Sequence, residues 1–297
     1  MNTIGETVKL LRKQKKLTQK SVYDGIVSRN FASRFEHGRS NIETSKFLLI
    51  LKRLDISPNE FQFIYERSAD ASLQQIVQEI DQASVLKDYD KLQRFYDRYR
   101  IDSTLNGQVI AAMAYVKIYV HGHNLFKMSL QPTYHLRVHL MESPSWSLFE
   151  LRSFVDGIFI FRQDQKALAL CLAKAIAAFN KYLELIEFRA EVEQSMASIL
   201  LNDLQIQLVA NSQDFSTAYQ KLIKTLAPKM TDFTAKLSIR FSQLLFNLYF
   251  QNDIDQVNLE AQSFLKSLDH LRFPESSVFK AIYNYHLPIC TDRELKK

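Results

Sequence analysis

The sequence predicts an all-α protein with a small N-terminal domain of short helices followed by a longer series of helical hairpins. The 297 residues include only six glycines and six prolines, and Leu, Lys, Gln and Ala recur throughout, a usage that favours helices. Apolar residues recur at helical spacing and do not alternate as they would in strands. The length suits two domains, which we place at residues 1–66 and 67–297.

The net charge of +6 belongs to the N-terminal domain. Residues 1–67 carry 13 Lys and Arg against 7 Asp and Glu, whereas the rest of the chain carries 25 of each. A basic module on a neutral body is expected where one end of a protein meets a polyanion such as DNA. Charge alone leaves open a basic helical domain that is merely solvated.

Several classes of protein lack support in the sequence. Cys171 and Cys290 are the only cysteines, too few for a disulfide framework and wrongly spaced for a zinc cluster. The N-terminus has no apolar signal segment, and no stretch approaches the ~18 apolar residues of a membrane span. Phosphate-binding glycine loops, nucleophile elbows and paired-cysteine motifs are missing. We therefore expect a cytoplasmic protein that is not an enzyme, has no cofactor and contacts no membrane.

Capping residues and apolar stripes predict the first two helices. Ile4, Val8 and Leu11 recur at i, i+4 and i+7 and form one apolar stripe, with cationic residues in the last turn, where they favour the helix dipole. Thr18 is a candidate N-cap for a second helix of about seven residues. Gly25 is expected to help end that helix.

The third helix is the candidate recognition helix. It begins after Ser28, a candidate N-cap, and ends before Gly38, a candidate C′ glycine. At 100° per residue, Phe31 and Phe35 gather on one side together with Ala32. The opposite side carries Arg29, Asn30, Ser33, Arg34 and His37. Guanidinium and amide groups on one exposed face can read base edges in the major groove.

Two further helices complete the first domain. One stripe predicts the fourth helix and consists of Phe47, Ile50, Leu51 and Leu54. The fifth helix begins at Ser57-Pro58-Asn59-Glu60, which combines an N-cap, a proline at the first helical position and a capping box. Five short helices in about 65 residues is a lambda-repressor-like layout.

The segment from Leu17-Thr18-Gln19 to Ser33-Arg34-Phe35-Glu36-His37-Gly38 resembles the helix-turn-helix of the phage-repressor (XRE) family. This resemblance implies contacts to phosphate and the groove edge by Thr18 and Gln19. It implies that the bases are faced by Arg29, Asn30, Ser33 and Arg34. It also implies contacts to the DNA backbone beyond the recognition helix, made by Arg39 and Ser40. We include Ser28 in this interface.

The same resemblance implies a structural ion pair between Arg12 and Glu36. Phe31 departs from the usual small or polar residue at its position, so it either packs inside, which we favour, or contacts a thymine methyl group. The alternative for the whole domain is a small helical bundle that binds no DNA, as in some antitoxin-like or scaffold proteins.

The second domain is predicted to be a degenerate TPR-like α-solenoid. Acidic or amide residues separate helices at Asp88, Asn124, Asp164, Asp214 and Asp253, at intervals of 36, 40, 50 and 39 residues. These intervals are close to the ~34 residues of a tetratricopeptide repeat and the ~40–47 of other helical solenoids. We expect hairpins at 69–103, 106–142, 146–183, 188–227 and 232–270, and a closing helix at 275–290.

A stack of such hairpins has a concave inner face that commonly holds peptides. Most of its aromatic residues are expected in the core, because a solenoid buries apolar stripes between its layers. Polar residues within apolar runs are better candidates for peptide binding, and we select Arg152, Asn202, Arg240 and Asn247. The alternative is that each of them bonds only to neighbouring helices or solvent.

Two passages resemble the Rgg/GadR/MutR regulators of Gram-positive bacteria. They are Ser33-Arg34-Phe35-Glu36-His37-Gly38-Arg39-Ser40-Asn41-Ile42 and Trp146-Ser147-Leu148-Phe149-Glu150-Leu151-Arg152-Ser153-Phe154. The resemblance implies a homodimer on a two-fold DNA operator, controlled by a short signalling peptide in the repeat domain. Many relatives have an asparagine two residues after the second passage, where this chain has Asp156.

Two other groups of residues are not expected to form functional sites. His121, His123, His135 and His139 lie close together, and the last two are spaced as zinc ligands can be. No H-E-x-x-H motif or nearby cysteine completes a site, so we expect no metal. The acidic residues Glu184, Glu187, Glu191 and Glu193 are expected to form a solvated helix face.

The sequence thus predicts a DNA-binding transcription regulator of quorum-sensing type. Two rivals remain: a helical-repeat interaction scaffold with a vestigial DNA module, and a regulator that responds to a small molecule or to no ligand. Sequence gives neither the operator nor the choice between activation and repression.

Overall fold

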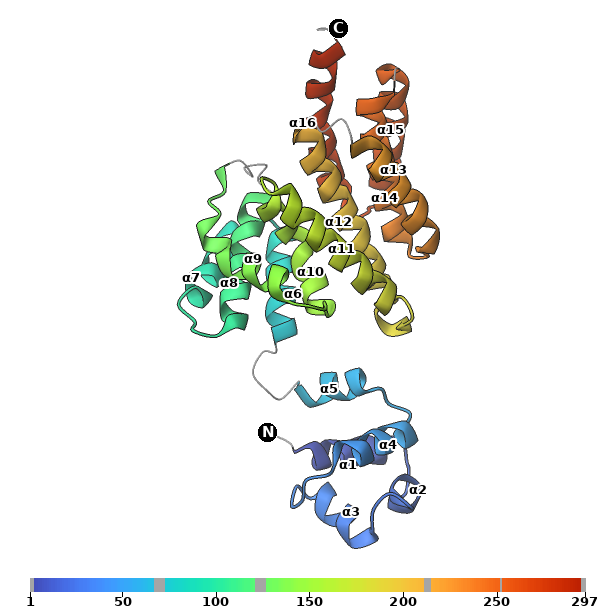
Figure 1. Ribbon diagram of the computed structural model, residues 1–297. Helices are drawn as coiled ribbons and strands as arrows, with labels where there is room; N and C mark the ends of the chain where they lie inside the picture. The colour runs from blue at the N-terminus through green and yellow to red at the C-terminus, as the bar shows by residue number, and fades with distance from the viewer. Residues whose placement is uncertain (1–2, 67–72, 121–126, 211–214, 252, 295–297) are drawn as a thin grey trace. The chain divides into compact units, whose positions relative to one another are not determined.

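The computed structural model describes residues 3–66, 73–120, 127–210, 215–251 and 253–294 (Figure 1). Every regular element in these ranges is a helix, so the predicted all-α class is confirmed. The chain divides into two compact units, Met1–Glu79 and Ile80–Lys297, and the division falls within α6 (Leu73–Val85). The two units are described separately below.

The first unit contains the short helices that capping residues predicted. Their bounds are α1 (Ile4–Gln14), α2 (Gln19–Tyr23), α3 (Arg29–Glu36), α4 (Thr44–Leu54) and α5 (Pro58–Glu66). Thr18 caps α2 by accepting from the Ser21 amide, and Ser28 caps α3 by accepting from the Phe31 amide. The second helix has five residues, slightly fewer than expected. Gly38, which follows the end of α3, has a φ of +69°, as expected for a C′ glycine.

The core of this unit lies between all five of its helices. Val8 and Leu11 are buried there, but Ile4 is 42% exposed, so the predicted stripe of α1 was wrong at its first position. Gly5 is buried in its place, one residue farther along the helix. A Cβ atom at Gly5 would lie 1.7 Å from the carbonyl oxygen of Phe35. Only glycine therefore allows the backbones of α1 and α3 to approach so closely.

The second unit is a series of helical hairpins. The bounds of their helices are α6 (Leu73–Val85), α7 (Tyr89–Tyr99), α8 (Leu105–Val120), α9 (Tyr134–Glu142), α10 (Leu148–Gly157), α11 (Gln165–Tyr182), α12 (Arg189–Ala210), α13 (Phe215–Leu226), α14 (Phe233–Phe250), α15 (Ile254–His270) and α16 (Ser276–Glu294). These helices follow the predicted ranges, except that α8 begins one residue before its range and α16 ends four residues beyond its own. Short 3₁₀ turns precede several of them: η2 (Gln131–Thr133), η3 (Ile158–Phe161), η4 (Ile186–Phe188) and η5 (Ala227–Lys229). Of the predicted helix separators, Asn124 and Asp214 lie outside the described residues.

The hairpins stack so that their first helices form one continuous layer. Helices α8, α10, α12, α14 and α16 pack against one another in that order, and we call them the first-helix layer. The second helices, which include α9, α11 and α15, each pack against the first helix of their own hairpin. This alternation is the arrangement expected of a helical solenoid.

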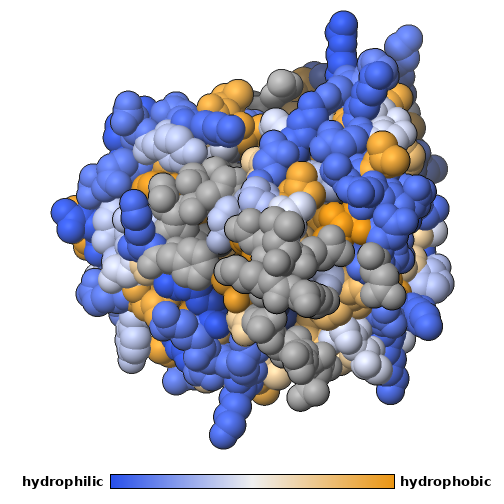
Figure 2. Space-filling model, turned by 90° about the horizontal axis from the view of Figure 1, so that it is seen from above, coloured by the Kyte–Doolittle hydropathy of each residue, from blue (hydrophilic) through white to orange (hydrophobic). Residues whose placement is uncertain are grey.

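Aromatic side chains fill the space between the helices of the second unit. Phe154, Phe161, Phe179 and Phe241 are fully buried, whereas Phe250 is 42% exposed. The expected core position is therefore confirmed for these four buried residues but not for Phe250. On the face seen in Figure 2, hydrophilic side chains predominate, and hydrophobic ones appear between them in separate patches. Among the described helices, none combines the length and the apolar character that a membrane span requires.

Candidate nucleic-acid interface and ligand surface

The third helix presents the polar face that the sequence predicted. Arg29, Asn30 and Arg34 are exposed, and Ser33 is half-buried beside them. Ala32 and Phe35 are buried, and the half-buried Phe31 packs against the same core. The preferred inward position of Phe31 is therefore confirmed. The face combines two guanidinium groups, an amide and a hydroxyl, all of which can donate hydrogen bonds to bases or phosphates.

A buried ion pair fixes this helix to α1. The Nε atom of Arg12 lies 2.6 Å from Oε1 of Glu36, and Nη2 lies 2.7 Å from Oε2. The Nη1 atom of Arg12 also donates to the carbonyl oxygen of Leu17, before α2. The predicted structural pair is confirmed, and it links the first three helices of the domain.

The Glu36 carboxylate is ionised in this setting. Burial alone would raise the pKa of Glu36, but hydrogen bonds from Arg12 and Gln19 outweigh that effect and hold its pKa below the ordinary value. Gln19 donates from Nε2 to Oε2 of Glu36 at 2.9 Å. This bond positions the Gln19 amide group, and the side-chain carbonyl oxygen of Gln19 takes no part in it.

The remaining predicted DNA contacts lie around the same face. Thr18 and Ser28 are exposed N-caps, at the starts of α2 and α3, and Arg39 is exposed beyond Gly38. Ser40 is half-buried. All nine predicted residues thus belong to α2, α3 and the segments that flank them.

Sequence reasoning missed a bridge from this helix to α1. His37 Nδ1 donates to the Ser33 carbonyl oxygen at 2.7 Å, with Nε2 left to accept from Lys9 Nζ at 3.0 Å. The half-buried Lys9 is thereby held near the end of the recognition helix. No motif signalled this pairing, because the two residues are 28 positions apart.

In the second unit, solvent-facing stripes run along the first-helix layer. On α12 the stripe consists of Glu191, Gln194, Ser198, Asn202, Gln205 and Val209. On α14 it consists of Phe233, Lys236, Leu237, Arg240, Gln243, Asn247 and Phe250. Spacings of three and four residues place each set on one helix face. We call these two stripes, together with Arg152 and Val155 of α10, the first-helix surface.

All four predicted peptide contacts belong to the first-helix surface, and three of them already have intramolecular partners. Arg152 pairs with Glu191, its Nη2 atom lying 2.6 Å from Oε2. Asn202 donates to the carbonyl oxygen of Val155 at 2.8 Å, and the exposed Arg240 pairs with Glu260 at 3.2 Å. Asn247 is half-buried, and within the described part of the chain its side chain has no hydrogen-bond partner. Sequence reasoning missed the apolar, serine and glutamine members of the stripes, whose residue types carry no distinctive signal.

The tryptophan passage has a structural explanation. Trp146 is buried, donates to the carbonyl oxygen of Leu140 at the end of α9, and packs edge-to-face on Phe154. Glu150 completes a capping box with Ser147 and accepts from His139 at 2.8 Å. These contacts join the second hairpin to the third.

Asp156, the residue that departs from the family pattern, also has a partner. It pairs with Lys117 of α8, and the same ammonium lies 2.9 Å from Asp81 of α6. Burial disfavours the charged ammonium, but the two carboxylates outweigh this effect and raise the pKa of Lys117. The three charged residues connect α6, α8 and α10.

The histidines do not assemble where they can be described. His121 and His123 lie outside the described residues, His139 is engaged by Glu150, and His135 is exposed. In the part of the chain that the structure describes, no group of three or more His, Cys, Asp or Glu side chains could hold a metal ion.

The prediction of a solvated acidic face was wrong for Glu193. This carboxylate is fully buried and accepts from the backbone amides of Thr231 and Asp232 at 2.5 and 2.6 Å. It thereby satisfies amides at the start of α14, with Arg189 as its counter-ion at 2.8 Å.

Comparison with known families identifies the first unit. Residues 8–61 match the family model described as Helix-turn-helix, and they extend from α1 to α5. The first unit therefore contains a helix-turn-helix domain, as the sequence predicted.

The whole chain shares its fold with solved regulators. A protein described as a transcriptional regulator from Listeria monocytogenes EGD-e is 22% identical, with a TM-score of 0.74 and 98% of each chain covered. The SHP pheromone receptor Rgg2 of Streptococcus dysgalactiae is 17% identical, with a TM-score of 0.72 and coverage of 96% of this chain and 98% of that one. PrgX, in its complex with iCF10, is 15% identical, with a TM-score of 0.65 and coverage of 99% and 91%. The predicted combination of a helix-turn-helix domain and a repeat domain is thus confirmed as the fold of Rgg2 and PrgX.

Proposed function

We propose that the protein is a sequence-specific transcription regulator that reads DNA through the exposed face of α3. The observation that carries this proposal is the arrangement of Arg29, Asn30 and Arg34 on the solvent side of a helix whose other side is locked into the core. An arginine can make a bidentate contact with guanine, and an asparagine can do so with adenine. Thr18, Gln19, Arg39 and Ser40 then contact the phosphates on either side.

We further propose that two copies of the chain bind a two-fold operator. In helix-turn-helix dimers the recognition helices enter successive major grooves about one DNA turn apart, ~34–36 Å. A symmetric operator with two half-sites of similar sequence is therefore expected. Footprinting on the promoter-containing DNA next to the gene measures the half-site spacing directly.

The DNA proposal is tested with Arg34→Ala in the full chain. Loss of one bidentate contact is expected to cost ~1–3 kcal/mol per recognition helix and to relax base preference. Arg94→Ala is the matched control, because Arg94 is an exposed arginine on α7 of the second unit. Binding to operator and scrambled duplexes is measured by fluorescence anisotropy across a range of salt concentrations. Equal operator affinity of Arg34→Ala and the parent chain would contradict the proposal, and only unselective binding by the parent would favour a scaffold with a vestigial DNA module.

We also propose that a short signalling peptide controls this activity by binding the first-helix surface. Residues 67–297 are assigned to this role and to dimerisation. The surface offers Asn202, Asn247 and three glutamines among the apolar positions of α12 and α14, and amide side chains can bond both the N–H and the carbonyl groups of an extended peptide. Rgg2 is described as a pheromone receptor with a similar fold, which supports the same assignment here.

The intramolecular pairs suggest how the site is used. Arg152 and Arg240 are each held by one carboxylate, at Glu191 and Glu260, so a peptide carboxylate must compete for them. The Asn247 side chain can bind a peptide without first breaking an intramolecular pair. To act as a switch, the peptide must bind two conformations unequally, and typical coupling is ~1–3 kcal/mol.

The peptide proposal is tested by calorimetry on the full chain. Synthetic peptides are taken from the small open reading frames beside the gene, and operator affinity is measured with and without each. Asn247→Ala is expected to weaken peptide binding, whereas Asn180→Ala, an exposed asparagine on α11, serves as the control. If no such peptide binds, the regulator responds to a small molecule or to no ligand. If Asn247→Ala binds the peptide like the parent, the assignment of the peptide to Asn247 on this surface is contradicted.

A further inference from the structure

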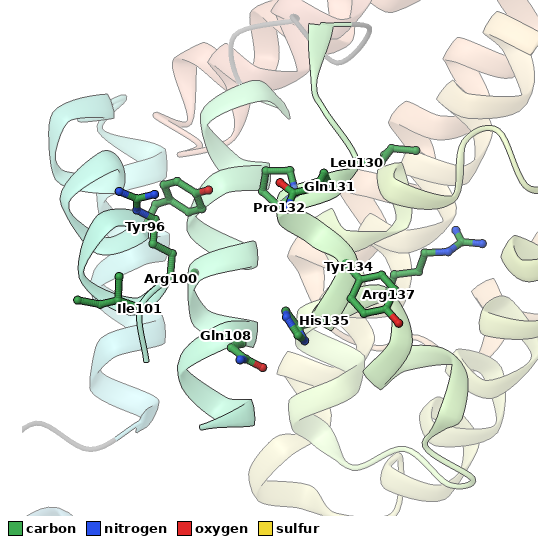
Figure 3. A pocket seen from close by; sticks show the side chains of 11 residues that line it. Tyr96, Arg100, Ile101, Gln108, Leu130, Gln131, Pro132, Tyr134, His135 and Arg137 are labelled. Atoms are coloured by element: carbon green, nitrogen blue, oxygen red, sulfur yellow. The ribbon is translucent and has the colours of Figure 1, made fainter. Parts of the chain in front are cut away.

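The structure contains a pocket of mixed polar and apolar lining that neither the DNA interface nor the first-helix surface uses. It has a volume of about 690 Å³ and lies between α7, the start of α8, and the segment formed by η2 and α9 (Figure 3). Its lining includes Gln108 and Ala111 of α8. At 100° per residue, these two lie on the side of α8 opposite Met113 and Lys117, which face α10. The pocket therefore opens on the side of the second helices.

The lining has a chemical bias toward anions. Arg100, His135 and Arg137 line the pocket, and no carboxylate is among its described lining residues. Gln108 and Gln131 add neutral amide donors. In Figure 3 the side chains of Gln108 and His135 point into the space between α8 and α9. Within the described residues, neither of these two side chains has a hydrogen-bond partner.

The two arginines differ in their availability. Arg137 is 2.6 Å from Asp164 and lies over the Phe161 ring at 4.9 Å from its centroid, so it contributes mainly its stem and its charge. Arg100 pairs at 3.1 Å with Asp97, and both side chains are about half exposed. Such exposed pairs contribute little to stability in water. A ligand anion can therefore recruit the Arg100 guanidinium at little cost.

Ring surfaces adjoin these donors. The Arg100 guanidinium lies 5.7 Å from the centroid of the Tyr96 ring. Tyr134, on the opposite wall, is 60% exposed, and Ile101 at the rim is 81% exposed. Aromatic faces beside fixed donors suit a flat ligand, because stacking and hydrogen bonding then act together.

From this geometry we propose that the pocket binds a small organic anion that carries a planar ring. Arg100 and His135 hold the anionic group, Gln108 and Gln131 fix its orientation, and Tyr96 and Tyr134 contact the ring. The volume is that of an ordinary small-molecule site. This ligand would bind on the other side of the second unit from the proposed peptide and would give the regulator a second input.

The test uses two probes that share this chemistry but differ in the anion. Adenosine monophosphate and salicylate are titrated into the full chain by calorimetry, with adenosine and benzamide as their uncharged counterparts. At least one anion is expected to bind with one site per chain and at least tenfold more tightly than its uncharged counterpart. Binding by one probe alone identifies the anion as phosphate or carboxylate.

Two variants locate the site. Arg100→Gln is expected to weaken binding at least tenfold, and Tyr134→Ser is expected to weaken it as well, while both retain the helical circular dichroism of the parent because both positions are exposed. Arg94→Gln is the matched control, because Arg94 is an exposed arginine of α7, the helix that Arg100 caps, and lies outside the pocket. Failure of both anions to bind, equal binding of the uncharged counterparts, or equal behaviour of Arg100→Gln and Arg94→Gln would overturn the proposal.

Discussion

The Arg12 guanidinium binds the carboxylate of Glu36 in two places, with Nε–Oε1 and Nη2–Oε2 distances of 2.6 and 2.7 Å. Glu36 is the last residue of the recognition helix and is fully buried, whereas Arg12 lies near the end of α1. A charge in such a place is stable only while its partner remains. The orientation of the DNA-facing surface therefore depends on one ion pair behind it.

We expect Glu36→Gln to destabilise the first unit by about 3–5 kcal/mol, because Arg12 is left without its counter-charge in a buried site. Folding lowers the pKa of Glu36. The pair therefore stabilises the fold at pH values above the ordinary carboxyl pKa, and this stabilisation is lost as the pH falls through the pKa that Glu36 has in the folded state. Urea unfolding of the full chain between pH 3 and 7 measures both effects. Glu60→Gln, at an exposed position of α5, should leave the transition in place, and an equal loss in both variants would refute the role of the pair.

The close approach of α1 and α3 predicts an unusual effect of Gly5→Ala. The new methyl group would collide with the Phe35 carbonyl oxygen, 1.7 Å from the Cβ position, so α1 must shift away from the recognition helix. Overpacking of this kind costs about 1–3 kcal/mol, and operator affinity should fall with it. Gly157→Ala is the control, because its nearest neighbour is a Leu136 side-chain atom at 3.5 Å and alanine is the better helix former. Unfolding midpoints that move in the same direction for both variants would contradict this account.

Local signals explain why so much of the fold was predictable. N-caps such as Thr18 and Ser28 and the C′ glycine Gly38 act through bonds to residues a few positions away, so the sequence alone predicts helix ends. The hairpin ranges followed from helical spacing and from the polar residues between helices. The inward position of Phe31 followed from its place on the same helix face as Phe35.

The features that escaped prediction depend on contacts between distant residues. Glu193 has the sequence context of a solvated helix, and only the position of Thr231, 38 residues later, makes it a buried cap. Arg152 was selected for a free guanidinium, but α12 brings Glu191 beside it. The pocket beside Tyr96 joins residues from three helices, none of which forms a motif.

The position of Asp156 leads to a third prediction. Asp156→Asn removes one of two carboxylates from Lys117, and Asp81 remains 2.9 Å away. We expect a loss of about 1.5–3 kcal/mol in the free energy of unfolding, the range of a hydrogen bond to a charged group. Asp81→Asn should cost less, because the Asp81 side chain is 54% exposed and that of Asp156 only 16%. Chemical denaturation of both variants at pH 7 shows which loses more free energy of unfolding. A larger loss for Asp81→Asn would show that Asp156 is not the main partner of Lys117.

A buried acid in the first-helix layer gives the fourth prediction. Asp203 of α12 is 2% exposed, and its nearest hydrogen-bond partner is Gln207 Nε2, at 3.5 Å. Burial raises the pKa of Asp203 to about 7, only partly offset by Gln207. The folded chain therefore holds a proton at this carboxyl that the unfolded chain releases near pH 4.

This difference fixes the sign of the pH dependence. Because the folded state binds more protons between pH 4 and 7, the contribution of Asp203 is fully present at low pH and is lost as the pH rises toward 7. Three pH units correspond to about 4 kcal/mol. Asp203→Asn cannot ionise, so its stability relative to the parent should increase from pH 4 to 7 and then level off. Asp232→Asn is the control, because asparagine keeps the side-chain acceptor that caps α14, and it should leave the urea midpoint nearly unchanged. If the advantage of Asp203→Asn in urea midpoints does not change with pH, the carboxyl is not protonated by burial.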